Sequence, residues 1–194
     1  MSTLTASSHA RRDRFADWAV IALVVIALAA GWLIKSSAEN ATQSINSAAG
    51  SFSYPSGWQT SKALGLSAQD TRTKSGIPTA FSITSETLDT DQGLDALSTR
   101  QTMRLAQDND GFSMLNINKE TIGGDNAVTL SYAYVAMSNA GTAASDRLPV
   151  VVEATDTLIK RGNTLYVLRF SADSTAYASL SDLRAKLLSS VKLP

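Results

Sequence analysis

An uninterrupted apolar stretch near the amino terminus constrains this chain most. The run from Trp18 to Ile34 contains no charged residue, proline or asparagine, and a tryptophan lies near each end. At a rise of 1.5 Å per residue, a helix of about 17 residues is roughly 25 Å long, just enough to cross a thin hydrocarbon core. Because lipid satisfies no backbone hydrogen bonds, the segment must be helical, and Trp18 and Trp32 suit the two interfacial belts. The sequence therefore predicts a single transmembrane helix over residues 15–35.

Positive charge on the two sides of this segment predicts its orientation. Arg11, Arg12 and Arg14 precede it, whereas Lys35 alone follows closely. The positive-inside rule then leaves residues 1–14 in the cytoplasm and sends the rest of the chain across the membrane. We expect a single-pass protein of the cell membrane with an extracytoplasmic domain.

A cleaved signal peptide is the alternative to a permanent anchor. The segment follows a basic region, and Ser36-Ser37-Ala38 matches a small-x-small cleavage site. However, the apolar run is longer than the usual 7–15 residues of a signal-peptide core, and Trp32 suits a permanent interfacial belt. An uncleaved signal anchor is therefore favoured.

Composition excludes several classes of function for the exported part. The chain has no cysteine, and its one histidine, His9, lies ahead of the anchor. The exported part consequently has no Ser-His-Asp or Cys-His system and no histidine or thiolate metal site. The net charge is zero and basic residues are scattered, so no nucleic-acid partner is expected. We predict no catalytic, cofactor-binding or metal-binding residues.

A polar segment separates the predicted anchor from the rest of the chain. Residues 36–51 are rich in Ser, Ala and Asn and predict a flexible linker. A linker of this length has an r.m.s. reach of roughly 20–25 Å, which keeps the following part close to the bilayer. Continuation of the anchor helix through Ala38–Ile45 is the alternative. Residues 52–194 then form one domain, large enough to bury a core.

Alternating apolar and polar residues predict most of this domain as antiparallel strands. Turns rich in Gly, Asn and Asp separate the predicted strands. The strands cover residues 52–58, 79–86, 113–120, 127–137, 148–159 and 164–171. Residues 64–76 are polar and predict a loop.

Two helices interrupt and close this series of strands. Asp91 is the expected N-cap of the first, which runs to about Asp108 and ends in the turn Asp108–Gly111. Ser174 is the expected cap of the second, whose apolar residues have helical spacing. That apolar stripe consists of Leu180, Leu183, Leu187, Leu188 and Val191. The sequence thus predicts an α+β fold, an antiparallel sheet flanked by helices.

The order of these elements and several short motifs resemble the PsbP family, the extrinsic proteins on the lumenal side of photosystem II and their bacterial relatives. The opening Phe52-Ser53-Tyr54-Pro55-Ser56-Gly57-Trp58 is similar to the family's aromatic-x-x-Pro-x-x-Trp start. Further matches are strand 79–86 with helix 94–105, the tyrosine-rich strand 130–134, strand 162–171 and the closing Leu-Leu-Ser-Ser-Val. The resemblance covers about residues 52–194 and implies an αβα sandwich. The retained anchor and the neutral domain depart from plant members, which are soluble and richer in lysine.

This resemblance, together with the anchor, implies a protein that is not an enzyme. We expect an accessory subunit, or an assembly or stability factor, that docks on a larger membrane protein complex from the extracytoplasmic face. The resemblance implies a respiratory or photosynthetic complex as that partner, and the lipid bilayer is the other expected partner. The alternative is an extracytoplasmic carrier or sensor of a small apolar ligand, held between the sheet and the Leu180–Val191 helix.

Several residues have both a functional and a structural interpretation, and the structural one is favoured for each. Glu86 and Glu153 act as an acid–base pair only if they face a common cleft. Tyr132, Tyr134 and Tyr166 line a small apolar pocket or, as we expect, pack in the core.

The remaining candidates are predicted to be structural. Asp108–Gly111 resembles part of a calcium loop, but the third acidic position and the closing Glu are missing, which favours a helix end. Asp89 and Asp91 are expected to cap the first helix. Trp58 follows a Pro-x-Gly turn and is predicted to close one end of the sheet core.

Overall fold

The computed structural model describes residues 18–32, 41–63, 65–89, 91–138 and 148–194. The chain divides into two units, Met1–Ala41 and Thr42–Pro194. In the first unit, residues 18–32 form a helix whose side chains are exposed. Within the described residues, no helix has both the length and the apolar character that crossing a membrane requires. The predicted tail, residues 1–14, and residues 36–40 of the predicted linker lie outside the described residues.

The second unit is built on a seven-stranded antiparallel sheet in the order β3-β4-β5-β9-β8-β7-β6. Its strands, in chain order, are β3 (Gln59–Ser61), β4 (Leu66–Asp70), β5 (Thr79–Thr87), β6 (Ser113–Ile122), β7 (Asp125–Met137), β8 (Pro149–Arg161) and β9 (Thr164–Asp173). A separate two-stranded sheet pairs β1 (Thr42–Ser47) with β2 (Gly50–Pro55).

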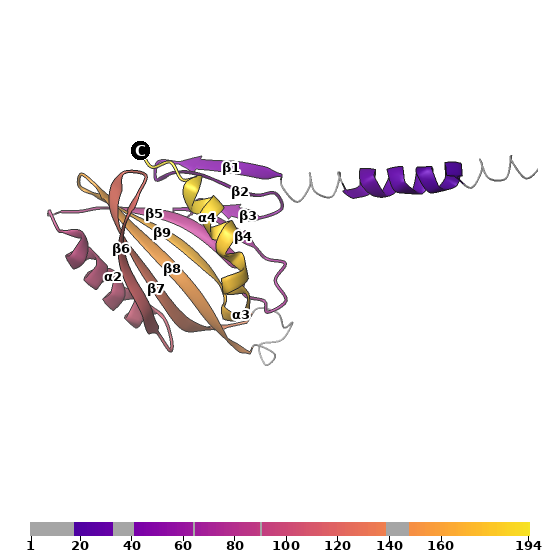
Figure 1. Ribbon diagram of the computed structural model, residues 1–194. Coiled ribbons are helices and arrows are strands. Elements are labelled where there is room, and N and C mark those ends of the chain that lie inside the picture. Colours follow the sequence, from indigo (N-terminus) through magenta and orange to yellow (C-terminus); the bar gives the residue numbers. More distant parts are fainter. Residues whose placement is uncertain (1–17, 33–40, 64, 90, 139–147) are drawn as a thin grey trace, which may run out of the picture. The chain divides into compact units, whose positions relative to one another are not determined.

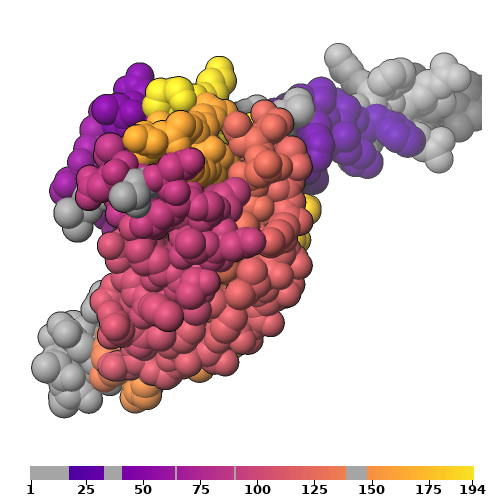
Figure 2. Space-filling view, turned by 90° about the vertical axis from the view of Figure 1, so that its left-hand side faces the viewer, coloured from indigo at the N-terminus to yellow at the C-terminus, as the bar shows by residue number. Residues whose placement is uncertain are grey.

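Helices cover both faces of the large sheet. One face carries α2 (Leu94–Asp108), and the other carries α4 (Ser181–Ser189) together with the β1–β2 hairpin (Figure 1). Two short elements, α3 (Ser174–Tyr177) and η2 (Ala178–Leu180), lead into α4. Figure 2 looks onto the domain from the side, with the segment around residue 100 in front and β6 and β7 beside it.

Each face of the sheet buries its own cluster of apolar side chains, because strand residues alternate between faces. On the α4 side, Phe81 of β5 and Phe170 of β9 pack with Phe52 of β2 and Leu187 of α4. On the α2 side, the strands contribute Val128, Leu130, Tyr132, Ala154 and Leu158. The predicted α+β fold, an antiparallel sheet with flanking helices, is confirmed.

The folded unit begins earlier than the sequence predicts. The composition of residues 36–51 predicts a linker, but β1 starts at Thr42 and pairs along its whole length with β2. Ile45 is the only buried residue of β1, so the strand has no alternating pattern from which to recognise it. Its stability comes from main-chain pairing with β2, which a sequence pattern does not reveal.

The prediction of a loop over residues 64–76 is wrong in its first half. Leu66 and Ala68 of β4 are fully buried, and the strand pairs with both β3 and β5. Only Leu66 and Ala68 alternate with polar residues in β4, and this pattern is too short to stand out among the polar residues around it. The remainder, from Thr71 to Pro78, has no strand or helix.

Both predicted helix caps are corrected by the structure. The N-cap of α2 is Gly93, without a side-chain cap, while Asp91 forms an ion pair with Lys160. The cap of α3 is Asp173, not Ser174, since its carboxylate accepts a hydrogen bond from the Thr175 amide. These hydrogen bonds from Thr175 hold the pKa of Asp173 below its usual range.

Gly65, which precedes β4, has a backbone conformation that only glycine adopts without strain. Its φ is +106°, and a Cβ atom there would lie 2.6 Å from the carbonyl oxygen of Ile83. Because that oxygen belongs to the sheet backbone, Gly65→Ala is expected to lower the free energy of unfolding by more than about 1 kcal/mol. Gly123→Ala is the matched control, since Gly123 also has a positive φ but a Cβ atom there would meet no other atom within 4 Å. If urea denaturation shows equal losses of unfolding free energy for the Gly65→Ala and Gly123→Ala variants, the predicted steric conflict is contradicted.

Candidate functional site

The α2 face of the sheet is apolar over β7 and β8 but polar over β5 and β9. Leu97 and Leu105 of α2 are buried in the apolar cluster of this face. Strand β5 buries Phe81 and Ile83 on the opposite side, so its polar alternate residues point here. These alternate residues are Ser82, Thr84 and Glu86.

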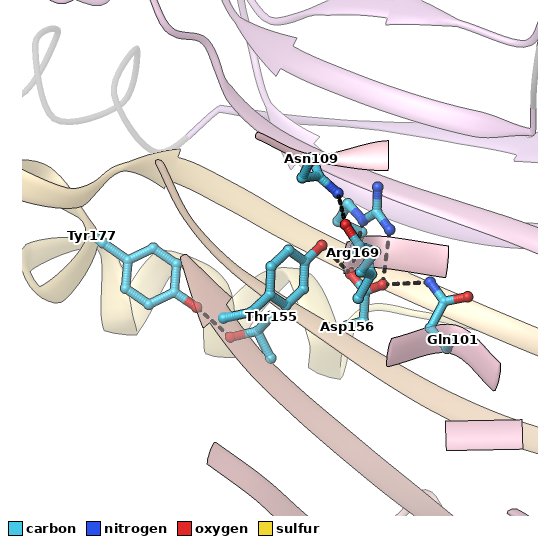
Figure 3. A network of polar contacts seen from close by, with 8 residues as sticks. Gln101, Asn109, Thr155, Asp156, Arg169 and Tyr177 are labelled. Atoms are coloured by element: carbon cyan, nitrogen blue, oxygen red, sulfur yellow. Dashed lines mark hydrogen bonds and ion pairs between the residues drawn. The ribbon is translucent and has the colours of Figure 1, made fainter. Parts of the chain in front are cut away.

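A fully buried carboxylate, Asp156 of β8, lies on this face. Its cross-strand neighbour Arg169 of β9 donates from Nε to Oδ1 and from Nη2 to Oδ2, each at 2.8 Å. The Tyr132 hydroxyl donates to Oδ1 at 3.0 Å, and Nε2 of Gln101 donates to Oδ2 at 2.8 Å. Figure 3 shows Gln101 and Arg169 directed at Asp156. Four donated hydrogen bonds use the acceptor capacity of the carboxylate.

Helix periodicity explains how Gln101 reaches this carboxylate. Leu97, Gln101 and Leu105 are spaced by four residues, and all three are buried on one face of α2. The two leucines anchor the helix on the sheet, so the amide between them is directed at Asp156. The helix then ends where predicted, with Asn109 donating from its side chain to the Leu105 carbonyl at 2.8 Å.

The electrostatics of this cluster keep its charges fixed. Burial lowers the pKa of Arg169, but hydrogen bonds to Asp156 and the charge of that carboxylate outweigh burial and raise the pKa above its ordinary value. Burial is also the main cause that raises the pKa of Tyr132, and the nearby Asp156 charge adds to it. Arg169 therefore stays protonated, and Tyr132 remains a neutral donor at physiological pH.

A cavity of about 330 Å³ opens beside Arg169. Its polar lining includes Ser82, Thr84, Ser85, Glu86, Arg104 and Asp108. Glu86 is held by Nη2 of Arg100 at 3.0 Å and lies 3.8 Å from Nη1 of Arg104. Charges of both signs and several hydroxyls suit a neutral or zwitterionic polar group, and they disfavour a simple anion.

The side chains that line this cleft carry hydroxyls, carboxylates and guanidiniums, with one amide and one valine. Its side chains include no cysteine or histidine, since the chain has no cysteine and its one histidine is His9. Within the described ranges, no group of three or more His, Cys, Asp or Glu side chains is arranged to hold a metal ion. The arrangement presents one guanidinium, fixed by a buried carboxylate, to whatever enters the cleft.

A second polar cluster ties the closing helices to the opposite face of the sheet. The Tyr177 hydroxyl forms a short hydrogen bond with Oγ1 of Thr155 and accepts another from Nη1 of Arg184 at 2.9 Å. The guanidinium of Arg184 also lies 5.4 Å from the centre of the Tyr177 ring, a cation–π arrangement. Figure 3 shows Tyr177 and Thr155 facing each other, apart from the Asp156 cluster.

The two strand glutamates do not meet. Glu86 lies on the α2 face, where its partners Arg100 and Arg104 belong to α2. Glu153 has the same strand phase as Thr155, which contacts Tyr177 on the other face. The acid–base interpretation of this pair therefore fails. Asp108, placed in the sequence at a helix end, lines the same cavity as Glu86.

The aromatic candidates pack in the core, as predicted, but not in one place. Tyr132 and Tyr134 stack on the α2 side with ring centres 6.1 Å apart. Tyr166 belongs to the cluster on the α4 side. Trp58 is buried in that same cluster, which confirms its expected place in the core.

Sequence reasoning missed Asp156, Arg169 and Gln101. A signal was present, because Asp156 occupies the inward phase of β8, where Val152, Ala154 and Leu158 are apolar. A carboxylate at an inward strand position needs a buried partner. The tight turn at Gly162-Asn163 sets the β8–β9 register that pairs Asp156 with Arg169. No local pattern shows that Gln101 of α2 faces this pair.

Comparison with known proteins supports the fold alone. The sequence matches no protein-family profile, and no curated protein matches it. The structure resembles the cyanobacterial PsbP of Synechocystis sp. PCC 6803 with a TM-score of 0.56 and 16% identity, covering 79% of this chain and 92% of that one.

Two further solved structures share this arrangement. The Pseudomonas aeruginosa protein PA94 has a TM-score of 0.53 at 12% identity, with 79% of this chain and 96% of that one covered. LpqN of Mycobacterium tuberculosis, involved in cell envelope biogenesis, has a TM-score of 0.51 at 15% identity, covering 79% and 85%. The domain of this chain thus has the fold found in cyanobacterial PsbP, PA94 and LpqN.

Proposed function

We propose that this chain is a membrane-anchored accessory protein, without enzymatic activity, that docks on a membrane protein complex from the extracytoplasmic face. The observation that carries the proposal is the order of its two units. An apolar helix with exposed side chains, at residues 18–32, precedes a domain with the PsbP-like fold. Such a helix needs an apolar environment for its side chains, and the basic residues before it favour insertion with the amino terminus inside.

Anchoring makes a weak docking surface sufficient. A tethered domain has an effective concentration near its membrane neighbours that far exceeds its average concentration in the compartment. The small sheet and the closing helices can then serve as a rigid scaffold rather than as a reactive site. LpqN, which shares the fold, is involved in cell envelope biogenesis, and this supports an envelope complex as host alongside a respiratory or photosynthetic one.

The anchor proposal is tested by replacing Val24 and Leu28 with Asp in the full chain. Each carboxylate at a helix centre is expected to cost about 2.5–3.5 kcal/mol of insertion free energy, so the variant should leave the membrane fraction on alkaline carbonate extraction. The unaltered chain should remain with the membranes. Met103→Asp and Leu115→Asp, two exposed sites of the domain, form the control and should not change the distribution. Release of the unaltered chain by carbonate would contradict the anchor.

The docking proposal is tested by extracting native membranes in mild detergent and separating the extract by size. Mass spectrometry of the fractions that contain this chain should identify a larger complex, and the Val24→Asp/Leu28→Asp variant should not migrate with it. Migration of the unaltered chain as a free monomer, with no partner in its fractions, would overturn the proposal.

The alternative function, a carrier of a small apolar ligand between the sheet and the Leu180–Val191 segment, has weaker support. Leu187 is buried there against Phe52 and Phe81, and its neighbours along α4 pack on the same cluster. These side chains occupy the space that a ligand would need. A second cavity of about 610 Å³ lies beside Leu180, between the Thr73–Ser75 loop and α3, and this is the place to look for bound molecules in the purified protein.

A further inference from the structure

Charged side chains of both signs line the cleft between α2 and the strands β5 and β9. Among the described residues these are Glu86, Arg104, Asp108 and Arg169. Glu86 is bound by Arg100 at 3.0 Å and lies 3.8 Å from Arg104, so this carboxylate is already compensated from α2. The charged groups that remain for a ligand are therefore the guanidinium of Arg169 and the carboxylate of Asp108.

The guanidinium of Arg169 presents an open edge to the cleft. Its Nε and Nη2 groups donate to the two oxygens of Asp156. A guanidinium has five N–H donors in one plane, and among the described residues no acceptor is bound by Nη1. Two parallel hydrogen bonds from such an edge are the usual way in which arginine binds a carboxylate. Because Asp156 already holds the guanidinium in place, a ligand carboxylate orders few additional rotamers when it binds.

Asp108 lies where a carboxylate is unfavourable unless a cation is near. It is the last residue of α2, and the carboxyl end of a helix carries a partial negative charge that favours basic side chains. The last turn of α2 nevertheless contains no basic residue. Within the described part of the chain, the Asp108 side chain forms no ion pair or hydrogen bond. A ligand ammonium would be attracted by both this carboxylate and the helix end.

The rest of the lining narrows the class of ligand. Val167 is its one apolar side chain among the described residues, and no aromatic ring lines the cavity, which disfavours an apolar or a stacked ligand. The carboxylates of the cleft repel a simple anion, and its guanidiniums repel a simple cation. The volume of about 330 Å³ lies at the small end of ligand pockets, which span roughly 300–1,000 Å³. A small ligand that carries both charges a few bonds apart fits this lining.

We propose that this cleft binds a free α-amino acid with a small, uncharged polar side chain, of the kind of L-glutamine or L-serine. The α-carboxylate accepts hydrogen bonds from the open edge of Arg169, and the α-ammonium donates to Asp108. The side chain of the ligand then lies against the hydroxyls of Ser82, Thr84 and Ser85 on β5. This binding activity goes beyond docking on a membrane complex and does not depend on the proposed anchor.

The test is isothermal titration calorimetry of the full chain in mild detergent, with L-glutamine and L-serine as ligands. At least one of them should bind saturably. For L-glutamine, two analogues separate the contacts: L-glutaminamide lacks the α-carboxylate, and glutaramate lacks the α-amino group. Each should bind at least tenfold more weakly than L-glutamine. Saturable binding of neither amino acid, or equal affinity for L-glutamine and both analogues, would overturn the proposal while leaving the docking function standing.

Two matched variants test the role of Asp108. Asp108→Asn should weaken L-glutamine binding at least tenfold but should not weaken glutaramate binding, because glutaramate has no ammonium. Asp110→Asn is the control, since Asp110 is equally exposed and is not among the described residues that line the cavity. It should bind L-glutamine as the unaltered chain does. Equal affinities of the Asp108→Asn and Asp110→Asn variants for L-glutamine would overturn the ammonium contact.

The two analogues also test the Arg169 contact without altering the fold. A variant at position 169 loses the partner of the buried Asp156, so a loss of binding in that variant could arise from unfolding. L-Glutaminamide removes the ligand carboxylate instead and leaves the protein unchanged. Binding of L-glutaminamide as tight as that of L-glutamine would overturn the contact between the ligand carboxylate and Arg169.

Discussion

Replacement of Arg169 by Met is expected to lower the free energy of unfolding by about 3–5 kcal/mol, because it leaves the buried Asp156 carboxylate without its charge partner. Asp156 is fully buried, whereas the Arg169 side chain is 39% exposed. Water can therefore reach a guanidinium that has lost its partner more easily than it can reach the carboxylate. We expect Asp156→Ala to cost less than Arg169→Met for this reason.

The measurement is urea denaturation followed by tryptophan fluorescence, in a background where Trp18 and Trp32 are replaced by Phe. Trp58 is then the only tryptophan, and it lies in the buried core of the domain. Asp95→Ala is the control, since both side chains of the Asp95–Lys119 ion pair are exposed. Exposed ion pairs contribute about 0–1 kcal/mol to the free energy of unfolding.

A double variant separates a structural role from a binding role of the same cluster. Replacing Asp156 by Leu and Arg169 by Met removes both charges, so the double variant should be more stable than Arg169→Met alone. If the cleft beside Arg169 serves binding, the stable double variant should lose partner or ligand while it keeps its fold. An Arg169→Met variant as stable as Asp95→Ala would contradict the proposed energetics.

The second large effect is expected at Leu187 of α4. This side chain is 1% exposed and packs in the cluster on the α4 face. Leu187→Ala is expected to cost about 2–5 kcal/mol, from lost transfer free energy and from the cavity left behind.

Leu183→Ala provides the matched control on the same helix. Leu183 belongs to the same apolar stripe but is only partly buried, so its truncation should cost clearly less in the same denaturation experiment. Equal losses of unfolding free energy at the two positions would mean that α4 is rotated about its axis relative to the structure.

Local sequence patterns were sufficient for most of the fold. Long strands such as β7 and β9 alternate cleanly between apolar and polar residues, and α2 ends at the predicted Asp108. Short elements were missed where the pattern is too brief to stand out, as in β1 and β4. The caps were misassigned because several polar residues precede each helix. Which of them lies next to the unpaired backbone N–H groups of the first turn depends on the backbone conformation at the helix start.

The sequence by itself determined the two-part organisation, the α+β class and the lack of cysteine and histidine in the domain, because periodicity and composition can be read from the chain directly. Only the tertiary structure decided which charges meet. Asp156 and Arg169 face each other across one hairpin, whereas Gln101 lies 55 residues from Asp156 and joins them only through the rotation of α2 on the sheet. The placement of α2 arises from packing between segments that are distant in the chain, and a local pattern does not contain that information.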